Sequence, residues 1–182
     1  MQKFLGSTAS KISPLISLLV ACSSAMRAGR SVAVARAELT DLTGEAVGTA
    51  ELWQESSGLV HVDVSASNLN PGAHGIHIHA VGRCDGGATG FSTAGGHYNP
   101  LNKQHGLTNP AGQHAGDAPN VQIAADGRGT LSFTTDRVTL TPGPTTVRDS
   151  VGRAIVVHAA PDDQMSQPAG NSGARVACGV IR

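Results

Sequence analysis

Aromatic residues are scarce in this chain, with three Phe, one Trp and one Tyr among 182 residues. Because so few rings are available, Val, Ile, Leu and Ala must fill the core of the folded domain. Neither charge is in excess, since 13 Lys and Arg stand against 13 Asp and Glu. No basic patch indicates a nucleic-acid partner, and the length favours one domain.

The chain also lacks an apolar run long enough to cross a bilayer. Lys3 and Lys11 precede the apolar run 12–21, which is short and is interrupted by Pro14. This pattern predicts a secretory signal peptide over residues 1–22 rather than a membrane helix. We therefore expect an exported protein in the periplasm or cell envelope, with a mature chain that is slightly acidic once the two lysines are removed.

The end of this leader, Leu19-Val20-Ala21-Cys22, resembles the lipobox of bacterial lipoproteins. In that interpretation Cys22 carries lipid and attaches the protein to a membrane, and residues 23–31 form a tether. The alternative is an ordinary signal peptide cleaved near Ala25 or Ala28, which discards Cys22. An unpaired thiol is a liability in an oxidising compartment, and this favours the lipoprotein.

Helical periodicity is absent, and short alternating or β-branched runs predict an all-β domain over residues 32–182. The runs lie at about 32–41, 45–55, 58–67, 74–80, 119–125, 128–135, 137–141, 153–159 and 176–181. Turn signals separate them, and Asp126-Gly127 is the strongest hairpin signal. The pattern predicts a Greek-key, immunoglobulin-like sandwich or a flattened eight-stranded barrel.

Two long stretches without regular patterning interrupt the strands, at residues 81–118 and 159–175. Long structureless loops inside a compact domain are usually functional. The first is rich in Gly, His, Asn and Pro. Metal binding would organise such a loop and offset the entropy lost when it becomes ordered.

Seven of the eight histidines fall in a spaced series with Asp117, and only His61 stands apart. His77 and His79 are two apart on a strand, so both imidazoles project to one face. Imidazole suits copper and zinc, and three histidines with a carboxylate make a shell that zinc accepts. Two separate four-ligand shells would need every donor of the series; alternatively, one histidine bridges two metals. His61 and Asp63 lie in an alternating run that places them on a solvent face.

Four blocks of sequence carry a family resemblance. They are His74-Gly-Ile-His-Ile-His79, Ala94-Gly-Gly-His-Tyr-Asn-Pro100, Arg153-Ala-Ile-Val-Val-His158 with Asp162-Asp163, and Gly173-Ala-Arg-Val-Ala-Cys-Gly-Val-Ile181. In this order they resemble the copper/zinc superoxide dismutases, and the likeness covers about residues 32–182.

The resemblance implies a role for each residue of the series. The copper ligands would be His77, His79, His97 and His158, and the zinc ligands would be His97, His105, His114 and Asp117. His97 then bridges the metals. His74 becomes a structural hydrogen-bonding residue beneath the site, and Asp162 a carboxylate that joins His77 to His105 and orients both rings.

The remaining cysteines, Cys84 and Cys178, form an even pair that in an exported domain is most simply a disulfide. They also match the intrasubunit bridge of the family. Two free buried cysteines are the alternative, and that state suits a reducing cytosol.

The implied activity is dismutation of superoxide to dioxygen and hydrogen peroxide by Cu(II)/Cu(I), with Zn(II) as a structural ion. This activity would protect the cell envelope from superoxide. His97 would carry a proton and Arg175 would attract the anion beside copper. Residues 159–175 resemble the electrostatic loop of the family but lack its usual Lys and Glu. Guidance of the anion is therefore expected to be weaker, or to come from Arg148, Arg153 or Lys103.

Two other classes stay open. One is a noncatalytic envelope protein that binds copper and zinc, although domains of that kind typically lose a copper ligand or the active-site arginine. The other is an exported structural sandwich with an incidental zinc site, which needs no His-x-His pair. No motif fixes the oligomeric state, and a homodimer is compatible with the sequence.

Overall fold

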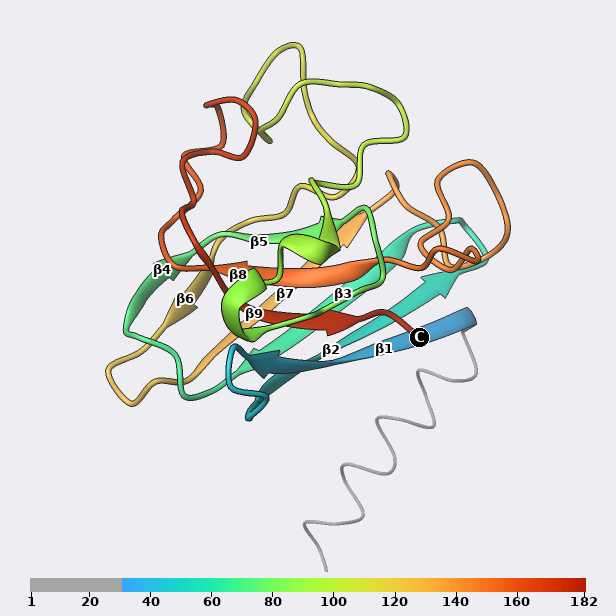
Figure 1. Cartoon of the computed structure of the whole chain (residues 1–182). Coiled ribbons are helices and arrows are strands. Elements are labelled where there is room, and N and C mark those ends of the chain that lie inside the picture. The colour runs from blue at the N-terminus through green and yellow to red at the C-terminus, as the bar shows by residue number, and fades with distance from the viewer. Residues whose placement is uncertain (1–30) are drawn as a thin grey trace, which may run out of the picture. The chain divides into compact units, whose positions relative to one another are not determined.

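The computed structural model describes residues 31–182, whose regular structure is almost entirely β (Figure 1). The elements are β1 (Ser31–Asp41), β2 (Ala46–Glu55), β3 (Val60–Ala66), β4 (Gly72–His74), β5 (Ile76–His79), η1 (Gly87–Thr89), η2 (Ser92–Ala94), β6 (Val121–Ile123), β7 (Gly129–Thr135), β8 (Ala154–His158) and β9 (Arg175–Val180). Within this range no helix is long and apolar enough to cross a membrane. The expected leader 1–22, with Cys22, and residues 23–30 of the expected tether lie outside the described residues. Ser31, also expected in the tether, is the first residue of β1.

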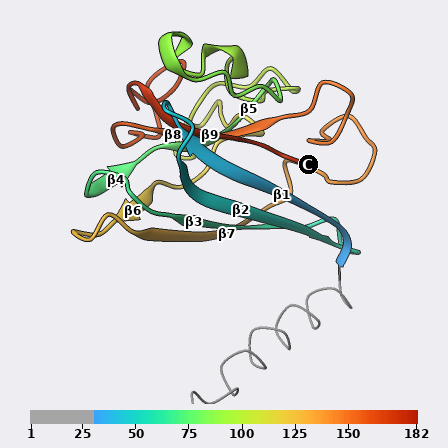
Figure 2. The same ribbon diagram turned by 60° about the horizontal axis from the view of Figure 1, so that its bottom comes forward.

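Seven strands form one curled antiparallel sheet in the order β5-β8-β9-β1-β2-β3-β7, and β4 pairs with β6 in a second, two-stranded sheet. The large sheet bends into a half-barrel, so that β5, β8 and β9 lie across the core from β2, β3 and β7 (Figure 2). The prediction of an all-β sandwich or flattened barrel is thus confirmed.

Alternation of apolar and polar residues explains the packing of β2 against β3. Val62 and Val64 face the core opposite Leu52 and Ala50, and all four side chains are buried. His61 projects to the other face, where its ring stacks on Trp53 with centroids 4.8 Å apart. Its half-buried position agrees with the solvent-face interpretation made from the sequence.

Every residue of β5 is buried. Ile76 and Ile78 point into the main core, while His77 and His79 point to the opposite face. That face is covered by the two long loops, which lie side by side above β5 and β8 (Figure 1). The fold therefore encloses the histidine face of the strand between sheet and loops.

Two of the predicted strands differ from the structure. The run 74–80 is divided at Gly75, because β4 pairs with β6 whereas β5 pairs with β8. A Cβ on Gly75 would lie 2.9 Å from the Cβ of Ser172, so a side chain has no room where the chain changes sheets. The prediction of one continuous strand there is wrong.

The run 137–141 is not a strand, although Val138 and Leu140 are buried. Two of its backbone N–H groups bond to a side chain: Leu140 and Thr141 donate to Oε1 of Gln54, at 2.8 and 3.1 Å. A buried side chain on β2 thus replaces the neighbouring strand. The Asp126-Gly127 turn, in contrast, joins β6 to β7 as expected, with Ala124 N donating to Arg128 O at 2.8 Å.

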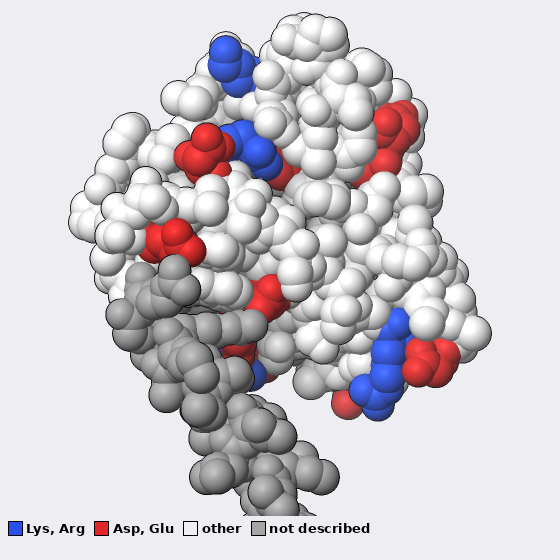
Figure 3. All heavy atoms as spheres, turned by 180° about the vertical axis from the view of Figure 1, so that it is seen from behind, with Lys and Arg blue, Asp and Glu red and all other residues white. Residues whose placement is uncertain are grey.

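Charged residues are few on the face seen in Figure 3, and the two signs are dispersed among neutral surface. This distribution follows from the composition, in which charged residues are 14% of the chain and balance one another.

Candidate metal centre

Four imidazoles meet above β5 and β8. His77 and His79 come from β5, His158 ends β8, and His97 reaches them from the first long loop. The nearest donor atoms of the four all lie within 4.8 Å of one another. We call these residues the first group.

Hydrogen bonds decide which nitrogen of each ring faces the centre of the first group. Nδ1 of His79 lies 2.9 Å from Gly95 O and Nδ1 of His158 lies 3.1 Å from Gly173 O. The two Nε2 atoms therefore face each other, 3.4 Å apart. His77 is reversed, since its Nε2 is 2.7 Å from Oδ2 of Asp162.

Two buried nitrogens of this group have no hydrogen-bond partner within residues 31–182: Nδ1 of His77 and Nε2 of His97. Buried polar atoms are almost always paired, so an orphaned pair that points to one centre is a mark of a ligand site. With Nε2 of His79 and Nε2 of His158, they supply four nitrogen donors. Four imidazole nitrogens suit copper.

Burial keeps these rings uncharged. Desolvation lowers the pKa of His77 to about 3 and that of His158 to about 4, and it also lowers the pKa of His79 and His97. Neutral imidazole is the form that binds a metal, so at neutral pH each ring has a nitrogen lone pair that can coordinate one.

A second group contains His97 again, with His105, His114 and Asp117. Oδ1 of Asp117 lies 3.0 Å from Nδ1 of His97, 2.9 Å from Nδ1 of His105 and 3.3 Å from Nδ1 of His114. Despite burial, these contacts and the Gly106 N–H hold the pKa of Asp117 well below its usual range. Three nitrogens and one carboxylate oxygen fit zinc.

Asp162 joins the two groups. Its Oδ2 contacts His77, as above, and its Oδ1 lies 3.0 Å from Nε2 of His105. The hydrogen bonds of both histidines lower the pKa of the Asp162 carboxyl although burial opposes this. Between Asp117 and Asp162, and against the effect of burial, the pKa of His105 rises to about 9. Asp162 thus fixes the orientations of the His77 and His105 rings through the nitrogens that face away from the donor groups.

His74 lies outside both groups. Its Nδ1 is 2.7 Å from His158 O and its Nε2 is 2.8 Å from Asn70 O. The buried ring therefore links the end of β8 to the turn before β4.

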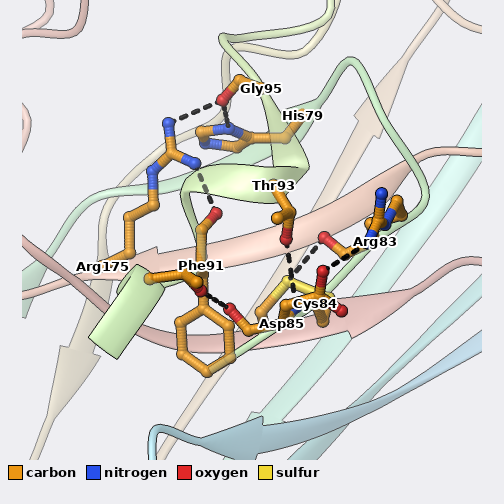
Figure 4. Close-up of a disulfide and its surroundings, with 10 residues drawn as sticks. His79, Arg83, Cys84, Asp85, Phe91, Thr93, Gly95 and Arg175 are labelled. Atoms are coloured by element: carbon orange, nitrogen blue, oxygen red, sulfur yellow. Dashed lines mark hydrogen bonds and ion pairs between the residues drawn. A yellow bond between two sulfur atoms is a disulfide. The ribbon is translucent and has the colours of Figure 1, made fainter. Parts of the chain in front are cut away.

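Arg175 opens β9 and turns toward the first group (Figure 4). Its two terminal nitrogens donate to Phe91 O and to Gly95 O, each at 2.6 Å. Gly95 O also contacts the His79 ring, so one carbonyl joins the arginine to a histidine of the first group. The guanidinium is half-buried, and burial lowers its pKa.

Comparison with known proteins agrees with this geometry. The family model for copper/zinc superoxide dismutase (SODC) matches residues 46–181. The chain belongs to this family. Superoxide dismutase [Cu-Zn] 1 of Aquifex aeolicus is 43% identical over 148 residues, which cover 80% of this chain and 86% of the relative. Superoxide dismutase [Cu-Zn] of Deinococcus radiodurans is 39% identical over 179 residues, covering 93% and 94%.

Other relatives are only described as dismutase-like. Superoxide dismutase-like protein YojM of Bacillus subtilis is 39% identical, covering 79% of this chain and 74% of the relative. The crystal structure of a SOD-like protein from Bacillus subtilis matches with a TM-score of 0.75 at 37% identity, covering 80% of this chain and 96% of that one. The copper/zinc superoxide dismutase fold therefore accounts for most of the chain.

The disulfide expected from the sequence is present between Cys84 and Cys178, with Cα atoms 5.6 Å apart. It ties the first loop to β9 beside a small buried cluster that includes Phe91. Phe91 is 1% exposed. The bond thus fastens the segment whose carbonyl oxygens hold Arg175 (Figure 4).

The basic residues suggested as alternative guides for the anion differ in their surroundings. Arg153 is buried, pairs with Asp149 at 2.6 Å and lies over the Tyr98 ring at 4.3 Å. Arg148 donates to Val34 O on β1. Both guanidinium groups are therefore held by structural partners, whereas Lys103 is exposed.

Several residues beside the groups were not anticipated from the sequence. Arg137 donates to Asp117 O at 2.6 Å, and the side chains of Gln164 and Gln167 contact the loop that carries His105. Little in the sequence indicated these residues. Arg137 lay in a run predicted to be a strand, and the glutamines belong to no metal-binding motif.

Proposed function

We propose that this protein dismutates superoxide, with copper held by His77, His79, His97 and His158 and zinc held by His97, His105, His114 and Asp117. One observation carries the proposal: the His97 ring belongs to both groups, and its buried Nε2 has no hydrogen-bond partner among the described residues. A histidine kept solely for packing would not leave a buried nitrogen unpaired.

The donor sets divide the chemistry between two metals. Copper in the four-histidine group would supply one-electron chemistry: one superoxide loses an electron and leaves as dioxygen, and another gains an electron, takes two protons and leaves as hydrogen peroxide. Zinc does not change its oxidation state, so the carboxylate-containing group suits a structural role.

His97 has the position of a proton carrier. Its Nδ1 is fixed 3.0 Å from Asp117, so the ring cannot turn freely, while Nε2 faces the first group. We propose that Nε2 takes up a proton and delivers it to the reduced substrate. Asp162 and Asp117 hold the neighbouring rings in place meanwhile.

Arg175 would attract the anionic substrate. Its guanidinium remains charged even though burial lowers its pKa, and two backbone oxygens fix its position. A fixed cation next to the first group stabilises an anion that approaches the metal.

We further propose that the enzyme works outside the cytoplasm, in the periplasm or cell envelope, and that Cys22 carries lipid. The disulfide and the bacterial relatives support an extracytoplasmic location. Mass spectrometry of the membrane fraction would test the lipid: a diacylated peptide that begins at Cys22 is expected, and an unmodified peptide that begins downstream would contradict it.

The experiment that tests the activity is inhibition of superoxide-driven dye reduction by the copper- and zinc-loaded protein. Activity that chelation removes and copper restores would support the proposal. Zinc alone should not restore it, because zinc cannot exchange an electron.

A noncatalytic copper- and zinc-binding protein is the second candidate, because some relatives are only described as dismutase-like. The complete donor sets and Arg175 favour the enzyme. Tightly bound, stoichiometric copper without dismutase activity would favour the second candidate.

A further inference from the structure

Two glutamine side chains join the long loops on the zinc side of the centre. Gln167 belongs to the second loop, and its side-chain amide makes two hydrogen bonds to the backbone of His105 in the first loop. Its Oε1 accepts the N–H of His105 at 2.8 Å, and its Nε2 donates to His105 O at 3.0 Å. One neutral amide thus satisfies both backbone polar groups of a histidine in the second group.

Gln164 makes the neighbouring contacts. Its Oε1 accepts the N–H of Leu107 at 3.2 Å, and its Nε2 donates to Ala118 O at 3.1 Å. The Gln164 carbonyl accepts the hydroxyl of Thr108 at 2.8 Å. A Cβ on Gly106, whose φ is +110°, would lie 2.1 Å from the same carbonyl, so the two loops touch without an intervening side chain.

These contacts bracket, in the sequence, three of the four donors of the second group: His105, His114 and Asp117. Gln167 holds His105 itself, and Gln164 holds Ala118, which follows Asp117. The carboxylates of Asp117 and Asp162 orient the His105 ring, but they do not fix where its backbone lies. The amide of Gln167 holds both backbone groups of His105. Asn109 Nδ2 also donates to His105 O, at 2.9 Å, but does not contact the His105 N–H.

We propose that Gln167 is a positioning residue for zinc, with Gln164 as its support, and that the pair forms a neutral clamp between the loops. This rests on the proposed function, because it takes His105 as a zinc ligand. The loop 159–175 contains no Lys or Glu. Besides the carboxylate of Asp162, it contacts the loop that carries His105 through these uncharged amides.

The clamp slows zinc dissociation, because His105 cannot move away from the ion while its backbone N–H and carbonyl are both hydrogen-bonded. Each neutral hydrogen bond contributes modestly in water. Loss of both should speed zinc release by about tenfold. Since the amides carry no charge, the effect should be the same at low and high salt.

The test measures zinc release from the metal-loaded full chain into a chromogenic chelator. Gln167→Met keeps the length of the side chain and loses both hydrogen bonds, whereas Gln167→Glu keeps the acceptor and loses the donor. Gln122→Ala, at an exposed glutamine on β6, is the control. We expect faster release from both Gln167 variants and an unchanged rate for the control.

A second readout reports the position of His105 directly. Cobalt(II) bound in place of zinc has visible absorption bands that depend on ligand geometry, and Gln167→Met should shift them. Release within twofold of the unaltered protein, with unshifted cobalt bands, would overturn the clamp alone. An unaltered protein that holds no zinc would overturn the proposed function as well.

Discussion

His97 shows how much of the proposed chemistry depends on one ring. Its side chain is 4% exposed, it belongs to both groups of donors, and each of its nitrogens faces a different group. The proposed two-metal centre therefore depends on which donors surround each nitrogen of this one residue, and single substitutions can separate the two sets of donors.

Asp117→Ala should empty the second group of its proposed zinc first, because the Asp117 carboxylate contacts all three histidines there and, of the first group, only the shared His97. We expect elemental analysis of the dialysed protein to show copper retained and zinc reduced to a small fraction. Asp163→Ala is the control, since this exposed carboxylate caps Met165 and Ser166 instead. Loss of copper with retention of zinc would invert the assignment.

Arg175→Ile should leave both metals bound and lower the second-order rate constant with superoxide by about tenfold or more, because a fixed cation near the reacting anion is removed. Pulse radiolysis measures this constant directly. Arg83→Ile is the matched control, as this exposed arginine pairs with Asp85 at 2.6 Å. An unaltered constant would remove Arg175 from the mechanism.

At the scale of elements, the centre is built from one strand face and two loops that the fold holds against it. The disulfide closes a loop with a sequence separation of 94 residues, and it anchors the segment that carries Phe91 and Gly95. The 142–152 connection supports the same region, because Thr146 O accepts the Tyr98 hydroxyl at 3.0 Å, next to His97.

Replacing both Cys84 and Cys178 with Ser should lower the free energy of unfolding by about 4 to 5 kcal/mol, since the bond no longer restricts the unfolded chain. Denaturant unfolding of the metal-free protein measures the change. Reduction of the unaltered protein should reproduce it. Equal midpoints for the oxidised, reduced and substituted proteins would contradict a stabilising role.

Sequence patterning predicted strands best where one face meets the core. In β3 the alternation Val60, Val62, Val64 was sufficient, because the register follows from it. The pattern failed for 137–141, where apolar residues are buried but the backbone bonds to Gln54, a long-range contact that no local pattern contains. The split at Gly75 depends on Ser172, which is equally remote in sequence.

The same limit applies to the site. The histidines and Asp117 were found from spacing and resemblance, because their chemical identity is visible in the sequence. Gln167 and Phe91 act through position rather than reactivity, and only the folded loops bring them to His105 and Arg175. Arg137 is a similar case, since its contact with Asp117 O crosses between a loop and the end of β7.

At the scale of the whole molecule, the buried histidines make the stability of the metal-free protein depend on pH. The pKa of His77 falls from 6.5 to about 3 on folding, and that of His158 falls to about 4. Between 6.5 and these values the unfolded chain binds protons that the folded protein does not, so stability falls as pH falls. His105 acts oppositely, adding stability as pH falls from about 9 to 6.5.

We therefore expect the melting temperature of the metal-free protein to be highest near pH 6.5 to 7 and to fall steadily toward pH 4. Differential scanning calorimetry across this range measures the profile. Bound copper and zinc should raise the melting temperature at neutral pH, because they bind only the folded state. A metal-free protein that becomes more stable toward pH 4 would contradict the neutral state of the four imidazoles of the first group.

The most direct measurement counts the superoxide that the copper- and zinc-loaded full chain consumes in repeated pulses, while the absorbance of Cu(II) is followed. A redox-cycling centre predicts that each copper removes many superoxide anions and that the Cu(II) absorbance returns to a steady value. Consumption that stops after one superoxide per copper, with the absorbance permanently lost, would contradict catalysis and leave a metal-binding protein.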